Sequence, residues 1–552
     1  MASELFLRLL KKRGFDESFL HPDYEKSVSG FSLPDMEKAV ERIIAAVEGK
    51  EKIIIYGDYD ADGVTASVVM HDALRLAGAE EGNIEIMLPN RFEDGYGMSE
   101  KVIERAKETG AKLVITVDCG SGNGEIVEKL KENGVETIVT DHHETPEELP
   151  KAVAVVTPKR KDFEASAEFK REEIRELAGV GVAFMVARAL VEKEKIPKGQ
   201  EKWLLDMVAI GTICDSMVVV GENRRLCYYG FKVIEKTRRV GLRELMRVAG
   251  VKKIDAEAIG FQIGPRLNAA GRMKTAETAL RLMMTKNRPE AAKLARELND
   301  LNFARKEQQA KAVEEVRRTI SEKDKVIVVA GKWHEGVLGI IAGKLSEKYK
   351  KPAFALTYVE KEGIYKGSGR SFGEFNLKET LDECSKLILG GGGHAAACGV
   401  KVAKEGLEDF RNGVNNYYRE LGLVNQERFL EKQVDVETEE LGEFDLELIE
   451  ELESLEPYGE GNRVPVFLLK DVLILNARLL GGKGEHLSLF VRGEDGETMK
   501  LMAFYAPAEW TGIEKGERAD IMVEVVENEW NGTRSAEGRI VGLEIRERTG
   551  RF

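Results

Sequence analysis

Short apolar runs that alternate with helix-like segments are the sequence feature that most constrains the fold. Four such runs occur in the first 141 residues: IIIYG (53–57), IEIML (84–88), LVITVD (113–118) and VETIVTD (135–141). Continuous apolar strands separated by helices are typical of a parallel sheet that is covered on both faces. The pattern predicts an α/β fold whose first domain, residues 1–285 with an N-terminal extension, is doubly wound.

The rest of the chain divides into three further regions. Residues 289–319 contain no glycine and one proline at the first position, which predicts a long connecting helix within 286–324. The run KVIVVAG at 325–331 begins a second, smaller α/β domain, expected over 325–425. Beyond Pro457, short strands and glycine-rich turns predict an antiparallel β-barrel like an OB-fold, so 426–552 is expected to hold an acidic helix and this barrel.

The net charge of −14, from 83 basic and 97 acidic residues, at first argues against a nucleic-acid partner. However, residues 427–456 hold 13 acidic and 2 basic residues, so this segment carries −11 and the remainder only −3. Apolar residues recur in the segment at three- and four-residue spacing, which predicts an amphipathic helix. Its acidic face either lies in solvent on a helix packed against a neighbouring domain or binds a basic partner.

Cysteine content and apolar runs bear on the compartment. The five cysteines are far apart and odd in number, which argues against a disulfide framework or a zinc knuckle and favours a reducing cytoplasm. The first residues, MASELFLRLLKKRG, do not have the pattern of a signal peptide. No apolar run approaches the roughly 18 residues of a membrane span, so no membrane role is expected.

Carboxylates and histidines follow three of the predicted strands. Asp58, Asp60 and Asp62 come directly after the first strand, and residues two apart in an extended chain point to the same side. A divalent cation would relieve their mutual repulsion, whereas the alternative is a solvated acidic turn. Asp118 and the sequence Asp141-His142-His143 end two other strands, and ligands bind at the carboxyl ends of parallel strands. Asp215 is either a further ligand or an ordinary cap residue.

This mixture of carboxylate and imidazole suits Mn²⁺ or Mg²⁺ better than a thiolate-rich zinc site would. Two such ions, about 3.5–4 Å apart, activate a water and stabilise the leaving oxygen in an in-line phosphoryl displacement. The sequence therefore predicts phosphodiester hydrolysis. Without the five expected carboxylate ligands the chain outside the acidic segment sums to +2, so the acidic total does not exclude a nucleic-acid substrate.

The chain resembles the DHH phosphoesterase superfamily in four motifs: GDYDADG, VDCG, TDHH and GGGGH. Six further motifs are similar to those of the RecJ family of single-strand-specific exonucleases: LPNRFEDGYG, LAGVGVAF, IGPRLNAAGR, WHEGVLGI, KGSGR and PYGEGN. They occur in order from about residue 53 to residue 467, which is most of the chain.

The resemblance implies a ligand set for two metal ions. Asp60 and Asp118 would hold one ion with Asp58 nearby, and the second ion would be held by Asp62, Asp118, His142 and Asp215. The resemblance places His143 opposite the scissile phosphate, so that His143, His142 and Asp118 form the catalytic group. Many superfamily members have a histidine where this chain has Tyr56, which raises the expected importance of Asp58.

Candidate substrate-binding residues lie in four segments. Arg91 and Tyr96 offer a phosphate fork and a stacking ring from one loop, which is either a surface turn or, as the resemblance implies, the holder of the 5′ end. The others, chosen because small neighbours allow a ligand to approach the backbone, are Arg266, Asn268, Arg272, Ser368, Arg370, Gly392, Gly393 and His394. His334 is as compatible with a structural role as with substrate contact.

Together these features predict a metal-dependent exonuclease that degrades single-stranded DNA, or RNA, and uses two divalent cations, with Mn²⁺ preferred to Mg²⁺. The resemblance adds 5′-to-3′ direction, mononucleotide products, a role in DNA repair and recombination, and partners such as a single-strand-binding protein, a RecQ-type helicase or replication factors. Two alternatives remain open. One is a phosphodiesterase for short oligonucleotides or cyclic dinucleotides, and the other is a non-catalytic, Cdc45-like replication scaffold.

Overall fold

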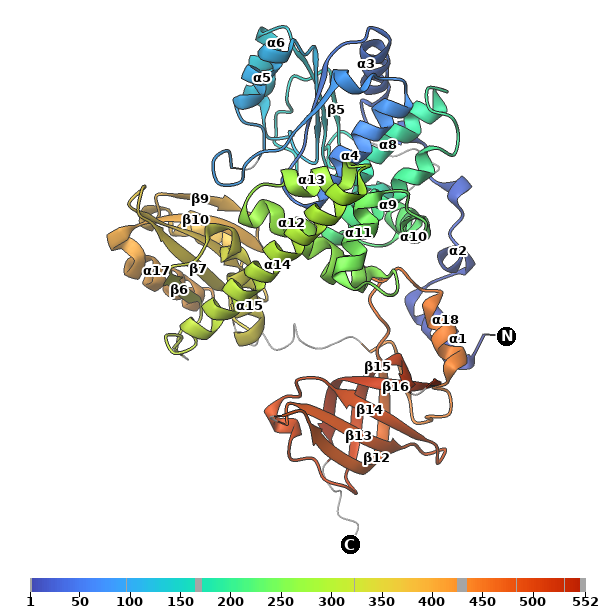
Figure 1. Cartoon of the computed structure of the whole chain (residues 1–552). Helices are drawn as coiled ribbons and strands as arrows, with labels where there is room; N and C mark the ends of the chain where they lie inside the picture. Colours follow the sequence, from blue (N-terminus) through green and yellow to red (C-terminus); the bar gives the residue numbers. More distant parts are fainter. Residues whose placement is uncertain are drawn as a thin grey trace. The chain divides into compact units, whose positions relative to one another are not determined.

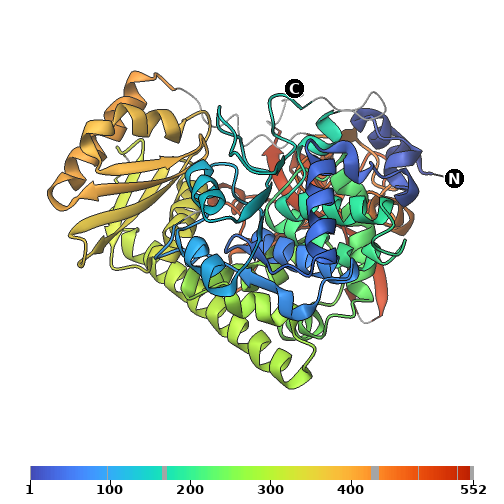
Figure 2. The same cartoon turned by 90° about the horizontal axis from the view of Figure 1, so that it is seen from above.

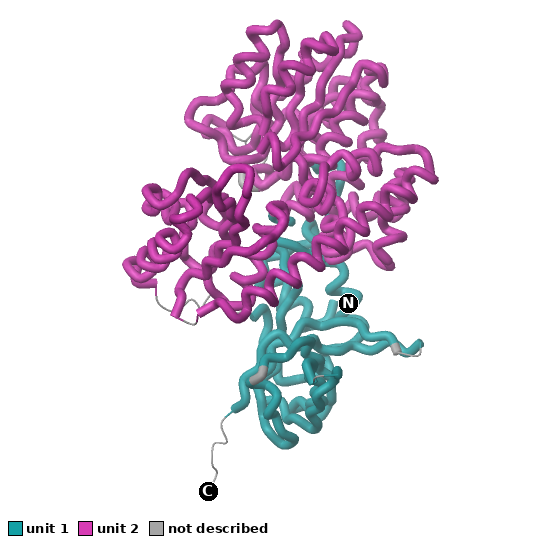
Figure 3. The backbone as a smooth tube through the Cα atoms, turned by 60° about the vertical axis from the view of Figure 1, so that its left-hand side comes forward, with its two compact units in different colours: residues 1–27, 218–220, 431–552 teal, residues 28–217, 221–430 magenta. Residues whose placement is uncertain are grey.

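A computed structural model describes residues 2–95, 97–163, 171–321, 323–423, 434–482, 484–530 and 532–546. The chain forms two compact units (Figure 3). Unit 1 comprises Met1–Ser27, Val218–Val220 and Glu431–Phe552, and unit 2 comprises Val28–Met217 and Gly221–Leu430.

A five-stranded sheet forms the centre of the first part of unit 2 (Figure 1). Its order is β2-β1-β3-β4-β5 and all neighbours are parallel. The strands are β1 (Ile53–Tyr56), β2 (Ile84–Met87), β3 (Leu113–Val117), β4 (Glu136–Thr140) and β5 (Ala154–Val156). This order changes direction between β1 and β3, which makes the carboxyl ends of these two strands the expected ligand crevice.

Helices cover both faces of this sheet, as the buried apolar runs require. On one face, α5 (Lys101–Thr109) and α6 (Gly124–Glu132) enclose a core with Ile54, Val114 and Val139. On the other face, α4 (Ala61–Leu76) and α8 (Gly179–Glu192) contact the strands. The predicted doubly wound parallel sheet is confirmed. The remaining helices before the long one are α3 (Met36–Glu48), α7 (Arg171–Arg175), α9 (Leu205–Cys214), α10 (Gly221–Glu235), α11 (Val240–Ala249), α12 (Gly264–Met273) and α13 (Glu277–Met284).

The long connecting helix is α14, Arg288–Val316, with Asn287 as its N-cap (Figure 2). It leads to a second sheet, β6-β7-β8-β10-β9, in which β6 and β7 are parallel and the other neighbours antiparallel. The strands are β6 (Ile327–Gly331), β7 (Ala353–Val359), β8 (Ile364–Arg370), β9 (Gly390–Gly393) and β10 (Ala397–Ala403). Helix α15 (Leu338–Tyr349) packs on one face, and α16 (Leu377–Glu383) and α17 (Leu407–Glu420) on the other.

Unit 1 contains a β-barrel. Its strands are β12 (Phe467–Leu480), β13 (His486–Arg492), β14 (Thr498–Ala503), β15 (Arg518–Trp530) and β16 (Thr533–Ile545). Pairing of β12 with β15 closes the barrel, and the short β11 (Val436–Thr438) lies beside β12. The neighbours are antiparallel except for β11–β12 and β14–β16. The barrel core also contains Leu5, Phe6 and Leu9 of α1 (Glu4–Arg13). Helix α2 spans Glu17–Leu20.

The amphipathic acidic helix is shorter than its sequence pattern predicts. Helix α18 spans only Leu446–Glu453, because Asp445 caps its start by accepting a hydrogen bond from the Leu448 amide at 2.9 Å. Leu441 and Phe444 are buried in the barrel core although they precede the helix. The apolar face packs within unit 1. In the described part of the chain, no helix is both long and apolar enough to cross a bilayer.

Candidate active site

Three carboxylates lie where β1 ends and α4 begins. Asp58 is buried at 4% exposure, and Asp62 in the first turn of α4 at 1%. Asp60 is the N-cap of α4, and its Oδ1 accepts hydrogen bonds from the amides of Asp62 and Gly63 at 3.0 Å each. Such a cap leaves the other carboxylate oxygen of Asp60 available to a ligand.

Asp62 is held by the start of another helix. Its Oδ2 accepts a hydrogen bond from the Gly179 amide at 2.7 Å, and its Oδ1 accepts one from the Val180 amide at 2.9 Å. Both amides belong to the first turn of α8, where unpaired N–H groups and the helix dipole stabilise negative charge. The carboxylate is therefore fixed before any cation binds.

Asp118 follows β3 in a left-handed backbone conformation, with φ at +60°. This conformation is costly for a residue with a Cβ atom, and such strain is typical of functional positions. A Cβ atom on Gly179 would lie 2.4 Å from Oδ1 of Asp118, and one on Gly211 would lie 2.7 Å from Oδ1 of Asp62. Two glycines thus make room for the two carboxylates.

The histidine pair follows β4. Nε2 of His142 lies 3.1 Å from Oδ1 of Asp118, 3.6 Å from Oδ2 of Asp215 and 3.9 Å from Oδ2 of Asp62. Nδ1 of His143 lies 2.8 Å from Oδ1 of buried Asp141, so this carboxylate holds the ring. Asp215 is the C-cap of α9, so the apolar run before it is a helix.

Among the described residues, three groups each offer three ligand atoms that lie within 4.8 Å of one another: Asp58, Asp60 and Asp118; Asp62, His142 and Asp215; and Asp118, His142 and His143. The third group shares Asp118 with the first and His142 with the second, so it joins those two groups. Oδ1 of Asp58 and Oδ1 of Asp118 are buried without accepting a hydrogen bond. Because an unpaired buried carboxylate oxygen is costly, these oxygens fit a pair of divalent cations.

Burial and mutual repulsion raise the pKa values of the clustered carboxyl groups. Burial, then the charge of Asp60, raises the pKa of Asp58 to about 8 and that of Asp62 to about 7. Burial and the charge of Asp62 raise the pKa of Asp215 to about 8. Burial raises the pKa of Asp118 well above its ordinary value, and neighbouring carboxylates add to the rise. The site therefore needs compensating positive charge at neutral pH.

The two histidines differ in charge. Burial and the neighbouring His143 lower the pKa of His142 to about 4, so its ring is neutral and suited to be a ligand. Burial alone would lower the pKa of His143, but its hydrogen bond to Asp141 and the charge of that carboxylate raise it to about 9. The second ring is therefore a cation at neutral pH.

A group of arginines lies next to the carboxylates. Arg272 is close enough to Asp60, Arg91, Arg370 and Arg305 to feel their charges, and burial lowers its pKa to about 10. Arg91 packs over the ring of Tyr59, with its guanidinium carbon 5.1 Å from the ring centre. Neighbouring guanidinium groups repel one another, and a bound polyanion would relieve this repulsion. The phosphates of a nucleic-acid strand supply such a polyanion.

The loop that carries Arg91 is held at both ends. The hydroxyl of Tyr56 donates to the Gly97 carbonyl and accepts from the Ser99 amide, both at 3.3 Å. Phe92 contacts the ring of His334 edge-on, with ring centres 5.1 Å apart. His334 also caps a short helical turn, because its Nδ1 accepts a hydrogen bond from the Gly336 amide. The predicted stacking ring, Tyr96, lies outside the described residues.

The three candidates on α12 have different surroundings. Arg272 lies in the arginine group described above. Oδ1 of Asn268 accepts a hydrogen bond from the Ala61 amide at 2.8 Å, so this residue supports the start of α4. Arg266 donates to Oδ1 of Asn299 at 3.1 Å and to the Gln262 carbonyl at 2.6 Å.

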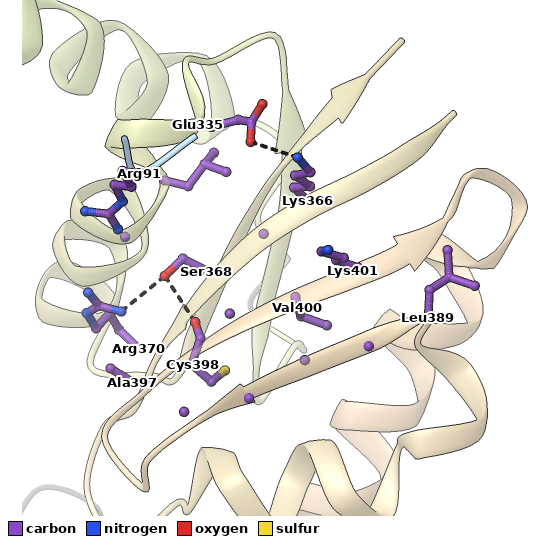
Figure 4. A pocket seen from close by; sticks show the side chains of 18 of the residues that line it. Arg91, Glu335, Lys366, Ser368, Arg370, Leu389, Ala397, Cys398, Val400 and Lys401 are labelled. Carbon is purple, nitrogen blue, oxygen red and sulfur yellow. Dashed lines mark hydrogen bonds and ion pairs between the residues drawn. The ribbon is translucent and has the colours of Figure 1, made fainter. Parts of the chain in front are cut away.

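A cavity of about 670 Å³ lies between the Arg91 loop and the second sheet (Figure 4). Arg91, Ser368, Arg370, Gly392 and Gly393 are among its lining residues. Nη1 of Arg370 donates to Oγ of Ser368 at 3.2 Å. The glycine run 390–393 forms strand β9 at the edge of the sheet, and its residues line part of the cavity. His394 follows this strand and is exposed, but it is not among the lining residues.

Comparisons with known proteins agree with this architecture. The models for the DHH family, N-terminal domain (residues 52–212), the DHHA1 domain (323–420) and the RecJ OB domain (434–541) match in this order. The single-stranded-DNA-specific exonuclease RecJ of Haemophilus influenzae is 34% identical over 489 residues, which are 84% of this chain and 82% of the relative. The chain belongs to the RecJ family.

Two further RecJ proteins extend the comparison. RecJ of Bacillus subtilis is 36% identical over 533 residues, and this chain spans 65% of that relative's length. The crystal structure of RecJ in complex with Mn²⁺ from Thermus thermophilus superposes with a TM-score of 0.81 at 29% identity, covering 98% of this chain and 76% of that one. RecJ membership favours a single-stranded-DNA-specific exonuclease over the phosphodiesterase and scaffold alternatives.

Some residues around the RecJ-type site are not evident from sequence. Arg305 lies on the long helix α14, where both its Nε and its Nη2 donate to Oδ1 of buried Asn302. Nothing in the helical pattern distinguishes Arg305 from other basic residues of α14. Gly179 lies within the quoted motif LAGVGVAF, but only the folded chain brings it to Asp118. Asp141 is evident in the sequence at the end of a predicted strand, but only the folded chain shows that it holds the ring of His143.

Proposed function

We propose that this chain is a metal-dependent exonuclease that degrades single-stranded DNA from the 5′ end and releases mononucleotides, in DNA repair and recombination. The observation that carries the proposal is the pair of ligand groups joined through His142 and Asp118, beside a group of arginines that form no ion pair with a carboxylate of the described residues. Single-stranded DNA supplies the phosphates that both groups require.

We assign one ion to Asp58, Asp60 and Asp118, and the other to Asp62, Asp118, His142 and Asp215. Bound ions would activate the attacking water and neutralise charge on the departing oxygen. We propose Mn²⁺ ahead of Mg²⁺, in line with the carboxylate and imidazole donors and with the Mn²⁺ complex of the Thermus thermophilus relative.

In this proposal the protein side chains position the strand and its charge. His143, held as a cation by Asp141, faces the scissile phosphate and donates a hydrogen bond to one of its oxygens. Arg272 and Arg91 bind neighbouring phosphates, and Ser368 with Arg370 binds the 5′ phosphate. Asn268 acts by supporting the Asp60 turn through Ala61. Arg266, Tyr96, Gly392, Gly393 and His394 remain proposed contacts of the strand.

The barrel of unit 1 is proposed to bind the strand as well. Three aromatic rings are grouped at the ends of β13 and β14: His486 lies 5.5 Å from Phe504 and 5.1 Å from Tyr505, ring centre to ring centre. Phe504 and Tyr505 are 61% and 81% exposed. Exposed aromatic rings on this part of an OB-fold stack with the bases of a single strand.

The domain boundaries at about residues 285, 325 and 425 belong to the same proposal, in which the two α/β sheets of unit 2 form the two walls of the active site. The helicase, single-strand-binding protein and replication factors expected from the sequence remain proposed partners. The cytoplasmic location is likewise proposed, and the five cysteines, none of which forms a disulfide, are consistent with it.

Digestion of a single strand labelled at either end tests the proposal. We expect the 5′ label to be released first, as a mononucleotide, from DNA faster than from RNA and with Mn²⁺ faster than with Mg²⁺. Release of the 3′ label first would contradict the direction. Activity confined to dinucleotides, with none on a long strand, would favour a phosphodiesterase for short oligonucleotides.

A further inference from the structure

The cavity of the second sheet extends beyond the residues that we assign to the 5′ phosphate. Side chains two apart on a strand share a face, so Arg370, Ser368 and Lys366 of β8 form one row. All three line the cavity. At the usual rise per residue the row is roughly 13 Å long. Arg370 is the end nearest the carboxylate cluster, because it is charge-coupled to Arg91 and Arg272.

The far end of the row carries a second cation. Lys401 of β10 is paired in register with Lys366, just as Gly399 is paired with Ser368. Lys366 forms ion pairs with Glu335 at 3.4 Å and with Glu362 at 2.5 Å. Among the described residues, none forms an ion pair with Lys401. The charged residues lining the cavity are Arg91, Lys366, Arg370, Lys401 and Glu335, which sum to +3.

Glycines keep this end of the cavity open. Gly390 and Gly392 of β9 lie opposite Lys401 and Gly399 of β10, and a Cβ atom on either β9 glycine would have no neighbour within 4 Å. If the 5′ phosphate of a DNA strand binds at Ser368 and Arg370, the part of the cavity beside Lys366 and Lys401 stays empty and positively charged. More negative charge attached to the 5′ phosphate would occupy that space.

We infer that the enzyme accepts single strands whose 5′ end carries a triphosphate, with Lys401 and Lys366 binding the β- and γ-phosphates. The inference rests on the proposed 5′-to-3′ activity, since it needs the 5′ end at Arg370. Strands with a 5′ triphosphate would then be substrates in addition to strands with a 5′ monophosphate.

The products of the first cut follow from the chemistry. The oxygen of water bonds to the phosphorus between the first and second nucleotides, and the bond from that phosphorus to the 3′ oxygen of the first nucleotide breaks. One proton of the water passes to the departing 3′ oxygen. The first product is then a nucleoside 5′-triphosphate, and the shortened strand keeps a 5′ monophosphate. Later cuts release mononucleotides.

The test compares the same short strand with a 5′ triphosphate or a 5′ monophosphate, using the full-length protein and Mn²⁺. We expect a nucleoside triphosphate as the first product of the triphosphate strand, detected by mass spectrometry. In Lys401→Met the KM for the triphosphate strand should rise about tenfold more than the KM for the monophosphate strand, the effect of one lost charge-assisted hydrogen bond. Lys401→Glu should enlarge that ratio further.

Lys386→Met is the matched control, because Lys386 is an exposed lysine of the same domain that does not line the cavity. It should leave both KM values unchanged. If only the monophosphate strand is degraded, the inference is overturned while the proposed function stands. A dinucleotide as the first product would overturn it too, because the cavity would then hold a nucleoside. If neither strand is degraded, the proposed function itself fails.

Discussion

Nε2 of His142 lies 3.1 Å from Oδ1 of Asp118, and this contact joins the two groups of potential metal ligands. Because the pKa of His142 is lowered, its ring is neutral and does not form a true ion pair with the carboxylate. The contact is instead the arrangement expected of two ligands that share one cation.

Replacing Asp118 with asparagine should have opposite effects on activity and on stability. Loss of a shared ligand should lower kcat at least about 10³-fold, because a metal supplies several kcal/mol of charge stabilisation. The folded metal-free protein disfavours the ionised form of Asp118, through burial and neighbouring carboxylates, so an uncharged amide there should raise its melting temperature. Nuclease assays and thermal melts with a chelator check the two effects. An active variant would refute the shared-ligand assignment.

Gly179→Ala should reduce activity without unfolding the protein. The added Cβ atom would lie 2.4 Å from Oδ1 of Asp118, so the carboxylate must move. We expect kcat to fall about 10²-fold, the effect of misplacing a catalytic group by roughly 1 Å. Gly181→Ala is the control in the same helix, because its nearest contacts would all be with the side chain of Leu177, the closest being Cδ2 at 3.2 Å. Equal losses in the two variants would point to α8 in general rather than to Asp118.

Metal binding should release protons, and affinity should rise with pH. Asp58 and Asp215 have pKa values raised to about 8, and Asp62 to about 7, mainly by burial, so these carboxyl groups are partly protonated near pH 7 without metal. Mn²⁺ affinity should therefore increase up to about pH 8 and then level off. Calorimetry in two buffers of different ionisation enthalpy measures the released protons. An affinity independent of pH would contradict the raised pKa values.

The same shifts give the sign of the stability change in the metal-free protein. A carboxyl group whose folded pKa is raised from 3.8 to about 8 favours folding most below pH 3.8, and this contribution is lost as the pH rises toward 8. In urea unfolding with a chelator, the contribution of these groups to the free energy of unfolding should therefore decrease as the pH rises across that range. Saturating Mn²⁺ should abolish the fall.

Asp141→Asn should lower the pKa of His143 from about 9, because the hydrogen bond to a charged carboxylate is the main cause of the rise. An NMR titration of the imidazole in the metal-free protein measures the shift. Activity at pH 8 should fall more than activity at pH 6.5 if the cationic ring binds the phosphate. Glu307→Gln, at an exposed position on α14, is the control and should leave the titration unchanged.

Tyr56→Phe should weaken binding of the strand more than it slows the reaction. The lost hydroxyl holds Gly97 and Ser99 at the end of the Arg91 loop. Loss of these hydrogen bonds should weaken binding of the strand by about 1 kcal/mol, which raises KM several-fold, while kcat stays nearly unchanged. A steady-state comparison with Tyr228→Phe as control checks this. A lower Mn²⁺ affinity would instead indicate that Tyr56 acts on the metal site.

The strand-end carboxylates and histidines could be located from sequence because parallel topology is restrictive. Once β1, β3 and β4 are neighbours in a parallel sheet, residues following them must meet at one edge, whatever their side chains. The clustering of Asp58, Asp118 and His142 follows from that rule. Their roles as ligands are a further step, which rests on distances and on the missing hydrogen-bond partners.

Other features depend on tertiary contacts that no local pattern encodes. Arg305 reaches the arginine group only because α14 passes the site, and Asn268 supports Ala61 only because α12 meets the start of α4. The glycines 390–393 form a strand because β10 offers them an edge. Leu441 and Phe444 fit a helical spacing but pack without a helix, because the barrel core buries them in an irregular segment.

Unit 1 combines residues from the beginning and the end of the chain, which has a consequence during synthesis on the ribosome. Leu5, Phe6 and Leu9 of α1 pack in a core whose other members begin at Val436. At about 5–20 residues per second, more than 400 residues of translation leave that apolar face uncovered for roughly 20–85 seconds. Newly made α1 is therefore an expected binding site for a ribosome-associated chaperone until the barrel strands have emerged.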